Sequence, residues 1–319
     1  MRGKKSPFSS PFIKGGKRGI SVIAYLTQAC IGGEGMRKKA FAKINLCLEV
    51  LNKRDDGYHN IKSLFARINL HDNLIFEKRK DREINITVKN NVNAFNIEFK
   101  SNLVYKAAER FINEFSIDCG MDIVLEKNIP IGAGLGGGSS DCASTLLGLS
   151  EIFEIDDKDR LFNISKEIGS DVMFFMKDCK FALCEGRGEM VNPVDVKAKL
   201  PYIILVFPDI NMSTKKVYET MSCDYKTNEE KINNLLAELG KKSEIDFSKY
   251  LFNRLENAVF KINSEVRELK NKIESFSIPS LMSGSGSSVF GISYDLNKIS
   301  SAFNKLKKSY NFVYISKIV

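Results

Sequence analysis

A regular alternation of apolar and polar residues opens the main part of the chain and predicts a β-strand. Every second position from 42 to 50 is apolar, namely Ala42, Ile44, Leu46, Leu48 and Val50. Successive side chains of a strand point to opposite faces, so this spacing predicts a half-buried strand over residues 40–51. Lys43 and Asn45 fall between the apolar positions and therefore share its polar face.

Similar patterns divide the rest of the sequence. Strands are expected at residues 61–70, 74–78, 83–88, 122–126, 202–207, 288–292 and 311–318. Apolar residues that recur every three or four positions predict helices at residues 103–115, 139–153, 157–168, 214–222, 228–239, 256–273 and 296–307. A second domain is expected to begin near residue 195, so the predicted domains are residues 36–194 and 195–319, preceded by an extension over residues 1–35.

The segment between the strand at 122–126 and the helix at 139–153 is rich in glycine. Its candidate binding residues are Pro130, Gly132, Gly134, Leu135, Gly136, Gly137, Gly138, Ser139 and Ser140. Glycine adopts positive φ and has no Cβ, so several backbone N–H groups of such a loop can face one polyphosphate. The N-terminal end of the following helix adds a positive dipole. The segment therefore predicts a phosphate-binding loop.

Other nucleotide-binding loops have different patterns. A Walker A loop has lysine directly after its last glycine, and Gly138 stands at that position. The G-x-G-x-x-G pattern of dinucleotide-binding folds is met by Gly132, Gly134 and Gly137, but no strand that ends in an acidic residue follows at the required distance. A flexible linker is disfavoured by the apolar segments on both sides. A kinase-type loop without a Walker lysine fits best.

Composition narrows the function classes. The chain of 319 residues is 43% hydrophobic and 27% charged, which is ordinary for a globular protein. Two histidines leave few bases for a Ser-His-Asp mechanism, and the seven cysteines form no C-x-x-C pair, so we expect reduced thiols and no zinc site. No apolar run reaches the ~18 residues of a membrane span, so no membrane partner is expected.

The net charge of +9 is unevenly distributed. Residues 1–35 hold six lysines and arginines against one glutamate, which accounts for five of the nine charges. In the rest of the chain basic residues are scattered among acids, so we expect an anionic small-molecule substrate and no nucleic acid. We expect that Met36 is the native start and that residues 1–35 are not part of the native fold. The expected location is cytoplasmic, or a plastid if residues 1–35 are a transit peptide.

Five motifs occur in one order along the chain. They are Ala42-Lys43-Ile44-Asn45-Leu46, Asp56-Gly57-Tyr58-His59, the glycine loop at 130–140, Gly169-Ser170-Asp171-Val172 and Ser283-Gly284-Ser285-Gly286-Ser287. Together they resemble the GHMP kinase superfamily from about Met36 to the C-terminus. The resemblance implies an α+β, two-domain fold, with an N-terminal domain like domain 2 of ribosomal protein S5 and a ferredoxin-like C-terminal domain.

Within the superfamily, the motifs are similar to the branch that phosphorylates the 2-hydroxyl of a cytidine diphosphate-linked methylerythritol in the non-mevalonate isoprenoid pathway. The resemblance implies ATP and Mg²⁺ as cofactors and identifies Lys43 and Asp171 as the catalytic pair. Asp171 would accept the proton of the attacking hydroxyl, and Lys43 would orient that hydroxyl. Taken singly, Lys43 also fits a solvent-facing lysine on an edge strand, and Asp171 fits a helix N-cap.

The resemblance also assigns the binding residues. Tyr58 and His59 would recognise the cytosine, with Tyr218 as a second stacking ring, although Tyr218 also fits the core face of a helix. Asn45 and Thr214 would contact the acceptor. Asn102, Leu103 and Lys127 would line the adenine side of the pocket. Ser283, Gly284, Ser285 and Gly286 would form a second phosphate-binding glycine loop.

One position departs from the family pattern. Proline usually follows Asp-Val, and Met173 stands there in this chain, so the φ angle that proline fixes is left to packing. No residue stands out as a Mg²⁺ ligand, so we assign no metal-binding side chain. A homoserine or mevalonate type of kinase, a dinucleotide-dependent oxidoreductase and a catalytically silent nucleotide-binding protein remain as alternative functions, and we expect a monomer or a weak homodimer.

Overall fold

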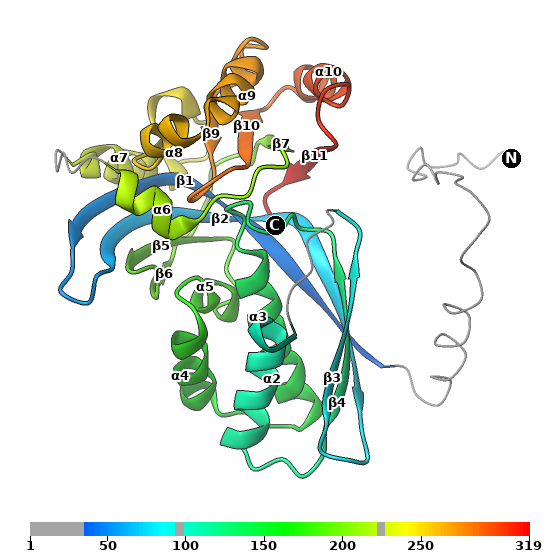
Figure 1. Cartoon of the computed structure of the whole chain (residues 1–319). Helices are drawn as coiled ribbons and strands as arrows, with labels where there is room; N and C mark the ends of the chain where they lie inside the picture. The colour runs from blue at the N-terminus through cyan, green and yellow to red at the C-terminus, as the bar shows by residue number, and fades with distance from the viewer. Residues whose placement is uncertain (1–34, 93–98, 222–226) are drawn as a thin grey trace, which may run out of the picture. The chain divides into compact units, whose positions relative to one another are not determined.

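Two β-sheets carry the part of the chain that the computed structural model describes, residues 35–92, 99–221 and 227–319 (Figure 1). The expectations for residues 1–34 lie outside this part. Residues 36–319 form one compact unit. The boundary expected between residues 194 and 195 stays a prediction.

The larger sheet is built around two long antiparallel strands. Its members are β1 (Met36–Lys53), β2 (His59–Lys78), β3 (Ile84–Asn90), β4 (Met121–Lys127), β5 (Phe181–Gly186), β6 (Met190–Pro193) and the short β8 (Phe252–Asn253). The order β3-β4-β2-β1-β8 forms one path, and β5 pairs with β2 and carries β6. β2 therefore pairs with β1 along one edge and with β5 and then β4 along the other.

The β1 strand is buried on both faces, so the expectation of a half-buried strand is wrong. Lys43 is 3% exposed, Asn45 1% and Glu49 0%. The face with Ala42 and Ile44 packs into the core that continues into the second sheet. The polar face is covered as well, because the glycine loop bonds directly to β1. The predicted sharing of one face by Lys43 and Asn45 is confirmed by a hydrogen bond between them.

Four helices lie on one face of the larger sheet (Figure 1). They are α2 (Leu103–Glu114), α3 (Gly137–Ile152), α4 (Lys158–Ile168) and α5 (Val172–Met176), with the 3-10 turn η1 (Phe99–Ser101) before them. Their apolar residues join Phe65, Leu74 and Phe76 of β2 in one core cluster. The glycine loop leads from β4 into α3, as the sequence predicts.

The second sheet is antiparallel and comes from the C-terminal part of the chain. Its order is β11-β7-β10-β9, with β7 (Tyr202–Phe207), β9 (Ser280–Met282), β10 (Val289–Ser293) and β11 (Phe312–Lys317). The accompanying helices are α6 (Thr214–Thr220), α7 (Glu229–Leu239), η2 (Phe247–Lys249), α8 (Glu256–Ile262), α9 (Ser264–Glu274) and α10 (Leu296–Leu306).

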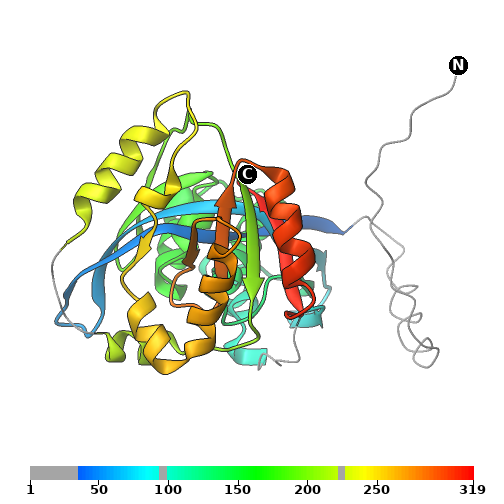
Figure 2. The same cartoon turned by 90° about the horizontal axis from the view of Figure 1, so that it is seen from above.

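The two sheets share a hydrophobic core. One buried cluster contains Ile44 and Leu46 of β1, Leu64 of β2, and Leu205 and Phe290 of the second sheet. Figures 1 and 2 show β1 and β2 passing between the second sheet and the helices α2 and α3. The long strands thus have helices on one side and a second sheet on the other, which explains why the middle of β1 is buried on both faces.

The topology contradicts the dinucleotide-binding alternative. That fold needs a parallel sheet, whereas β2 runs antiparallel to β1, β4 and β5. The observed elements differ from the predicted ones in three further ways. β2 is one strand rather than two, and the helix expected at 256–273 breaks at Asn263. The short strands β5, β6, β8 and β9 are not predicted by the sequence.

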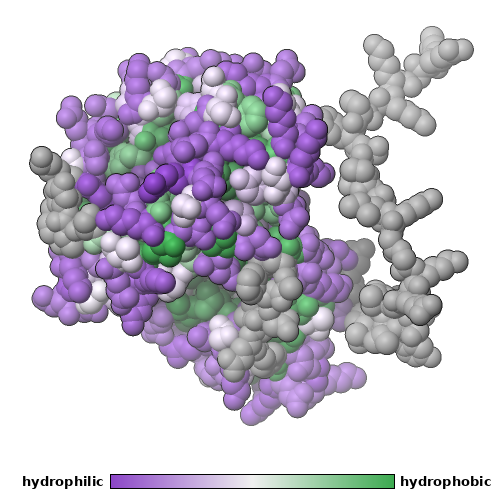
Figure 3. All heavy atoms as spheres, turned by 45° about the horizontal axis from the view of Figure 1, so that its top comes forward, coloured by the Kyte–Doolittle hydropathy of each residue, from purple (hydrophilic) through white to green (hydrophobic). Residues whose placement is uncertain are grey.

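Figure 3 shows one face of the described chain as mainly hydrophilic, with hydrophobic residues confined to small areas between polar ones. The described residues contain no helix with the length and apolarity of a membrane span. Their five cysteines are free: Cys47, Cys119, Cys142, Cys179 and Cys184.

Candidate active site

Lys43 lies in the middle of β1 with its ammonium group inside the protein. Its Nζ donates a 2.8 Å hydrogen bond to Asn45 Oδ1 and lies 4.7 Å from the centre of the Phe65 ring. A buried ammonium needs such partners because burial costs free energy when a charge is left unpaired. The alternative of a solvent-facing lysine on an edge strand is therefore wrong.

Asn45 is itself held by a chain of hydrogen bonds. Its Nδ2 donates to Ser63 Oγ at 2.8 Å, and that hydroxyl donates to the Cys47 carbonyl at 2.6 Å. With its amide nitrogen bound in this way, the Asn45 oxygen faces Lys43. The sequence contained no signal for Ser63, because its place opposite β1 depends on strand register.

Asp171 is far from Lys43 in the sequence but lies close to it in the fold. It precedes α5, and its Oδ2 lies 3.5 Å from Lys43 Nζ. Its side chain makes no capping hydrogen bond to α5, so the N-cap interpretation is not supported. Met173, which stands in place of the family's proline, is buried within α5 and accepts a hydrogen bond from Ser165 at its sulfur. Packing thus orders this turn without proline.

The glycine loop packs against Lys43 and turns directly into α3. The Lys43 backbone N–H donates to the Leu135 carbonyl at 3.0 Å. Gly136 precedes the helix with φ of 70°, and a Cβ there would lie 3.1 Å from Lys43 Cγ. No side chain caps the first turn of α3. Its leading N–H groups are therefore available to an anion, which fits a phosphate cradle.

The second glycine loop lies against the first. Ser283 Oγ donates to the Gly134 carbonyl at 3.0 Å, and the Ser288 N–H donates to the Ala133 carbonyl at 3.2 Å. A Cβ on Gly134 would meet the Ser283 carbonyl at 2.1 Å, and Gly134 has φ of +77°. Only glycine allows this approach. The two loops, about 150 residues apart in sequence, form one surface.

Side chains of the C-terminal part support the second loop. Asn253 Nδ2 donates to the Met282 and Gly284 carbonyls at 2.9 and 2.7 Å. Thr214 and Ser285 are joined through their hydroxyls at 2.9 Å. A Cβ on Gly284 would lie 3.3 Å from Lys43 Nζ, so this loop reaches Lys43 as well. Asn253 has no distinguishing sequence context, and its role follows only from the fold.

Lys127 lies beneath the glycine loop in a buried cluster of charges. Its Nζ contacts Asp72 and lies 2.7 Å from Asp141 Oδ2, and all three side chains are at most 3% exposed. A Cβ on Gly137 would lie 3.3 Å from the same nitrogen. The structure thus gives Lys127 a supporting role under the loop and does not expose its ammonium at the loop surface.

The two carboxylates of this cluster differ in their surroundings. Asp72 accepts hydrogen bonds from the backbone N–H groups of Asn128 and Ile129. Asp141 Oδ1 is buried without a hydrogen-bond partner. Burial raises the pKa of Asp141 against the opposing effect of Lys127, whereas the two carboxylates raise the pKa of Lys127 despite its burial. Asp141 therefore binds a proton more tightly in the folded chain than in the unfolded one.

Two more residues expected around the nucleotide lie near the loop. Asn102 caps α2, with its Oδ1 accepting from the Val104 N–H at 3.0 Å, and is 5% exposed. Leu103 Cδ1 lies 3.4 Å from a Cβ built on Gly138. Both therefore flank the start of α3, and their contact with adenine stays a prediction.

The rings expected around the cytosine lie next to the hairpin loop between β1 and β2. His59 and Tyr218 stack on each other with ring centres 5.0 Å apart and planes 24° apart. Tyr58 is 57% exposed and contacts Arg187, whose Cζ lies 5.1 Å from its ring centre. Burial and the Asp171 charge raise the pKa of Tyr218, and burial lowers that of His59, so both rings are neutral at neutral pH.

Sequence profiles of two known domains match the chain. The GHMP kinases N terminal domain matches residues 102–178, and the GHMP kinases C terminal domain matches residues 235–311. The first range contains the glycine loop and Asp171, and the second contains the second glycine loop.

Curated relatives cover most of the chain. A 4-diphosphocytidyl-2-C-methyl-D-erythritol kinase of Thermodesulfovibrio yellowstonii is 42% identical over 80% of this chain and 88% of its own length. One from Clostridium novyi is 37% identical over 88% of this chain and 99% of its own.

Solved structures agree with these relatives. A crystal structure of 4-(cytidine 5'-diphospho)-2C-methyl-D-erythritol kinase superimposes with a TM-score of 0.73 at 30% identity, covering 88% of this chain and 98% of that one. Homoserine kinase from Cytophaga hutchinsonii has a TM-score of 0.67 at 18% identity, covering 88% and 95%, which shows the fold alone.

Proposed function

The chain belongs to the 4-diphosphocytidyl-2-C-methyl-D-erythritol kinase family of GHMP kinases, and we propose that it transfers the γ-phosphoryl group of ATP to the 2-hydroxyl of 4-(cytidine 5'-diphospho)-2-C-methyl-D-erythritol, here called the cytidylylated acceptor. Its product would be the phosphorylated intermediate of isoprenoid precursor synthesis.

The observation that carries this proposal is the placement of Lys43 and Asp171. Their charged groups lie 3.5 Å apart, beside a surface made by both glycine loops. An ammonium, a carboxylate and free backbone N–H groups are the parts that phosphoryl transfer needs: positioning of the hydroxyl, acceptance of its proton and stabilisation of phosphate charge.

Asp171 accepts the proton as the hydroxyl oxygen bonds to phosphorus and the bond to the leaving ADP oxygen breaks. Lys43 donates hydrogen bonds to the attacking oxygen and to the transferred group. Asn45 keeps the ammonium in place, since its Oδ1 accepts from Lys43 and its Nδ2 is held by Ser63.

The glycine loop and the start of α3 bind the phosphates of ATP through backbone N–H groups. Mg²⁺ would offset their negative charge. The described residues contain no group of three or more His, Cys, Asp or Glu side chains that could hold a metal, so the ion would take most of its ligands from phosphate oxygens and water.

Cytosine stacks between Tyr58 and Tyr218 and receives hydrogen bonds from His59, while Thr214 supports the adjoining loop. The His59–Tyr218 stack of 5.0 Å leaves no room for a base between those two rings. A base that stacks on the Tyr218 face now covered by His59 requires His59 to leave that ring and turn its nitrogen atoms toward the edge of the base.

An assay of ADP release tests the proposal. The cytidylylated acceptor, mevalonate and homoserine are each offered with ATP and Mg²⁺. We expect acceptor-dependent ADP release with the first alone, because only it fills a site with aromatic rings for a base. Turnover of mevalonate or homoserine at a comparable kcat/KM would contradict the proposed acceptor.

A further inference from the structure

The turn between β5 and β6 lies at the active site, although no role has yet been assigned to it. This turn comprises Gly186, Arg187, Gly188 and Glu189. Gly188 is buried with φ of +117°, and a Cβ there would lie 3.3 Å from Asp171 Oδ1 and 3.6 Å from Ser170 Cβ. The turn thus packs directly on the catalytic carboxylate.

The same turn reaches the hairpin loop that carries Tyr58. The guanidinium of Arg187 lies over the Tyr58 ring, with Cζ 5.1 Å from its centre. The hydrogen bond from Arg54, supported by the charge of Arg187, holds the pKa of Asp56 below its usual range. Arg187 is therefore a cation between the proposed base site and the residue that accepts the proton.

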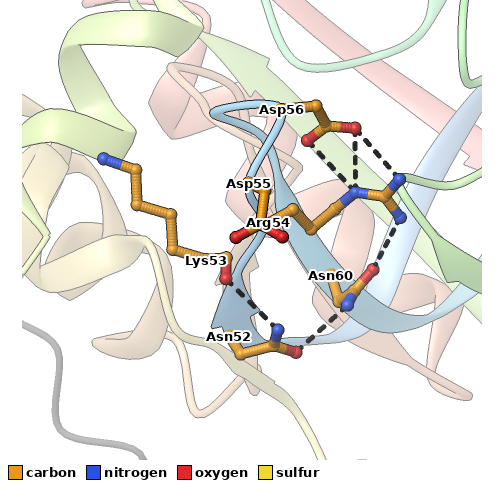
Figure 4. A pocket seen from close by; sticks show the side chains of 6 residues that line it. All are labelled: Asn52, Lys53, Arg54, Asp55, Asp56 and Asn60. Carbon is orange, nitrogen blue, oxygen red and sulfur yellow. Dashed lines mark hydrogen bonds and ion pairs between the residues drawn. The ribbon is translucent and has the colours of Figure 1, made fainter.

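Three other cations nearby already have partners. Figure 4 shows Arg54 bound to Asp56 and Asn60 at the tip of the hairpin. Lys62 contacts Glu229 at 3.0 Å and Glu185 at 3.8 Å. Lys43 is bound to Asn45 and Asp171.

Arg187 retains hydrogen-bonding capacity. Its nearest carboxylate is that of Glu189, whose Oε1 lies 3.8 Å from Nε, beyond a hydrogen bond. The other oxygen of Glu189 accepts the Arg187 backbone N–H at 2.6 Å. The side chain is 31% exposed. A guanidinium can stack on a ring with its face while its N–H groups bind phosphate at the edge.

We propose that Arg187 binds the diphosphate of the cytidylylated acceptor. The inference rests on the proposed function, because in that acceptor the diphosphate separates the cytosine from the methylerythritol. With the base at Tyr58 and the reacting hydroxyl at Asp171, the two phosphates pass the turn that lies between them. Arg187 then fixes the distance between the base and the reacting oxygen, and it selects acceptors that carry phosphate.

Binding of acceptor fragments tests this role. Cytidine, CMP and CDP are titrated calorimetrically into wild type, Arg187→Ala and Arg187→Lys, with a non-hydrolysable ATP analogue occupying the donor site. We expect Arg187→Ala to weaken CDP about 10-fold to 100-fold and to leave cytidine within about 2-fold, since one charge-assisted pair is lost. Arg187→Lys should recover part of the CDP affinity, because it restores charge without the bidentate geometry.

Kinetics provide a second readout. In Arg187→Ala the KM for the cytidylylated acceptor should rise by a similar factor, with KM for ATP and kcat nearly unchanged. Arg82→Ala is the matched control, because Arg82 is 80% exposed on the β2–β3 turn, where it pairs with Asp118.

The outcomes separate the inference from the function on which it rests. Equal losses of cytidine and CDP affinity would show that Arg187 only supports the Tyr58 ring, and unchanged CDP affinity would show that it does not meet the diphosphate; either result overturns the inference. Failure of the wild type to bind cytidine and to phosphorylate the acceptor would overturn the proposed function.

Discussion

The proposed active site has a donor side for ATP and an acceptor side for the alcohol, and the two are built in opposite ways. The donor side consists of the glycine loop and the buried cluster of Lys127, Asp72 and Asp141 beneath it. The acceptor side consists of the hairpin loop with Tyr58, the turn with Arg187, and Tyr218. Cluster side chains on the donor side are at most 3% exposed, whereas Tyr58 is 57% exposed and Arg187 31%.

This difference follows from what each side binds. Backbone N–H groups can grip a triphosphate only if the backbone stays in one conformation, so the donor side needs buried support. Base and diphosphate recognition uses side chains at the ends of strands, which can change without altering the core. In the proposed reaction the donor side would therefore hold ATP, while the acceptor side would select the alcohol that is phosphorylated.

The largest effect on activity should come from Asp171, the residue between the two sides. Asp171→Ala removes the proton acceptor, and we expect kcat to fall about 10²-fold to 10⁴-fold with little change in melting temperature. Steady-state kinetics and thermal unfolding measure both. Asp178→Ala is the control, because that aspartate is 83% exposed and lies seven residues away. Near-normal turnover in Asp171→Ala would remove it from the mechanism.

Breaking the donor side should cost stability. Lys127→Met leaves the buried carboxyl groups of Asp72 and Asp141 without their cation, so the free energy of unfolding should fall by about 3–5 kcal/mol. Urea denaturation measures this change. Lys89→Met serves as control, since Lys89 pairs with Glu126 at the surface of the adjacent strand. Full stability with a selective loss of ATP affinity would instead indicate that Lys127 contacts the nucleotide directly.

Breaking the acceptor side should change binding alone. Tyr58→Ala removes a stacking ring worth about 1–3 kcal/mol per base, so KM for the cytidylylated acceptor should rise roughly 5-fold to 150-fold. KM for ATP, measured in the same series, should stay nearly constant. Equal increases in the two constants would place Tyr58 outside the acceptor site.

The smallest expected effect is on the pH dependence of stability, through the buried cluster of Lys127, Asp72 and Asp141. Burial raises the pKa of Asp141, so the native state binds a proton there more tightly than the unfolded chain. The resulting stabilisation is complete at low pH and is lost as the pH rises through the native pKa. In Asp141→Asn, which cannot ionise, unfolding free energies from urea titrations at about pH 5 to 8 should depend less on pH. A slope like that of wild type would assign the proton elsewhere.

Much of the fold was predictable from local pattern. Alternation identified β1 and the shared face of Lys43 and Asn45, and the glycine loop was placed correctly between a strand and a helix. Short elements such as β5 and β6 were missed, because strands of four to six residues carry little periodicity of their own and are stabilised by pairing. The role of Arg187 was missed with them.

By itself, the sequence determined the local chemistry of this protein: a glycine-rich turn before a helix, a lysine two residues from an asparagine on a strand, and an aspartate before an apolar segment. Tertiary structure decided which of these groups meet. Lys43 and Asp171 are 128 positions apart, and their 3.5 Å contact depends on how α5 packs against α3, which itself packs on β1. The buried charges under the loop were decided in the same way, because the burial of a residue and the identity of its partner depend on segments that only the folded chain brings together.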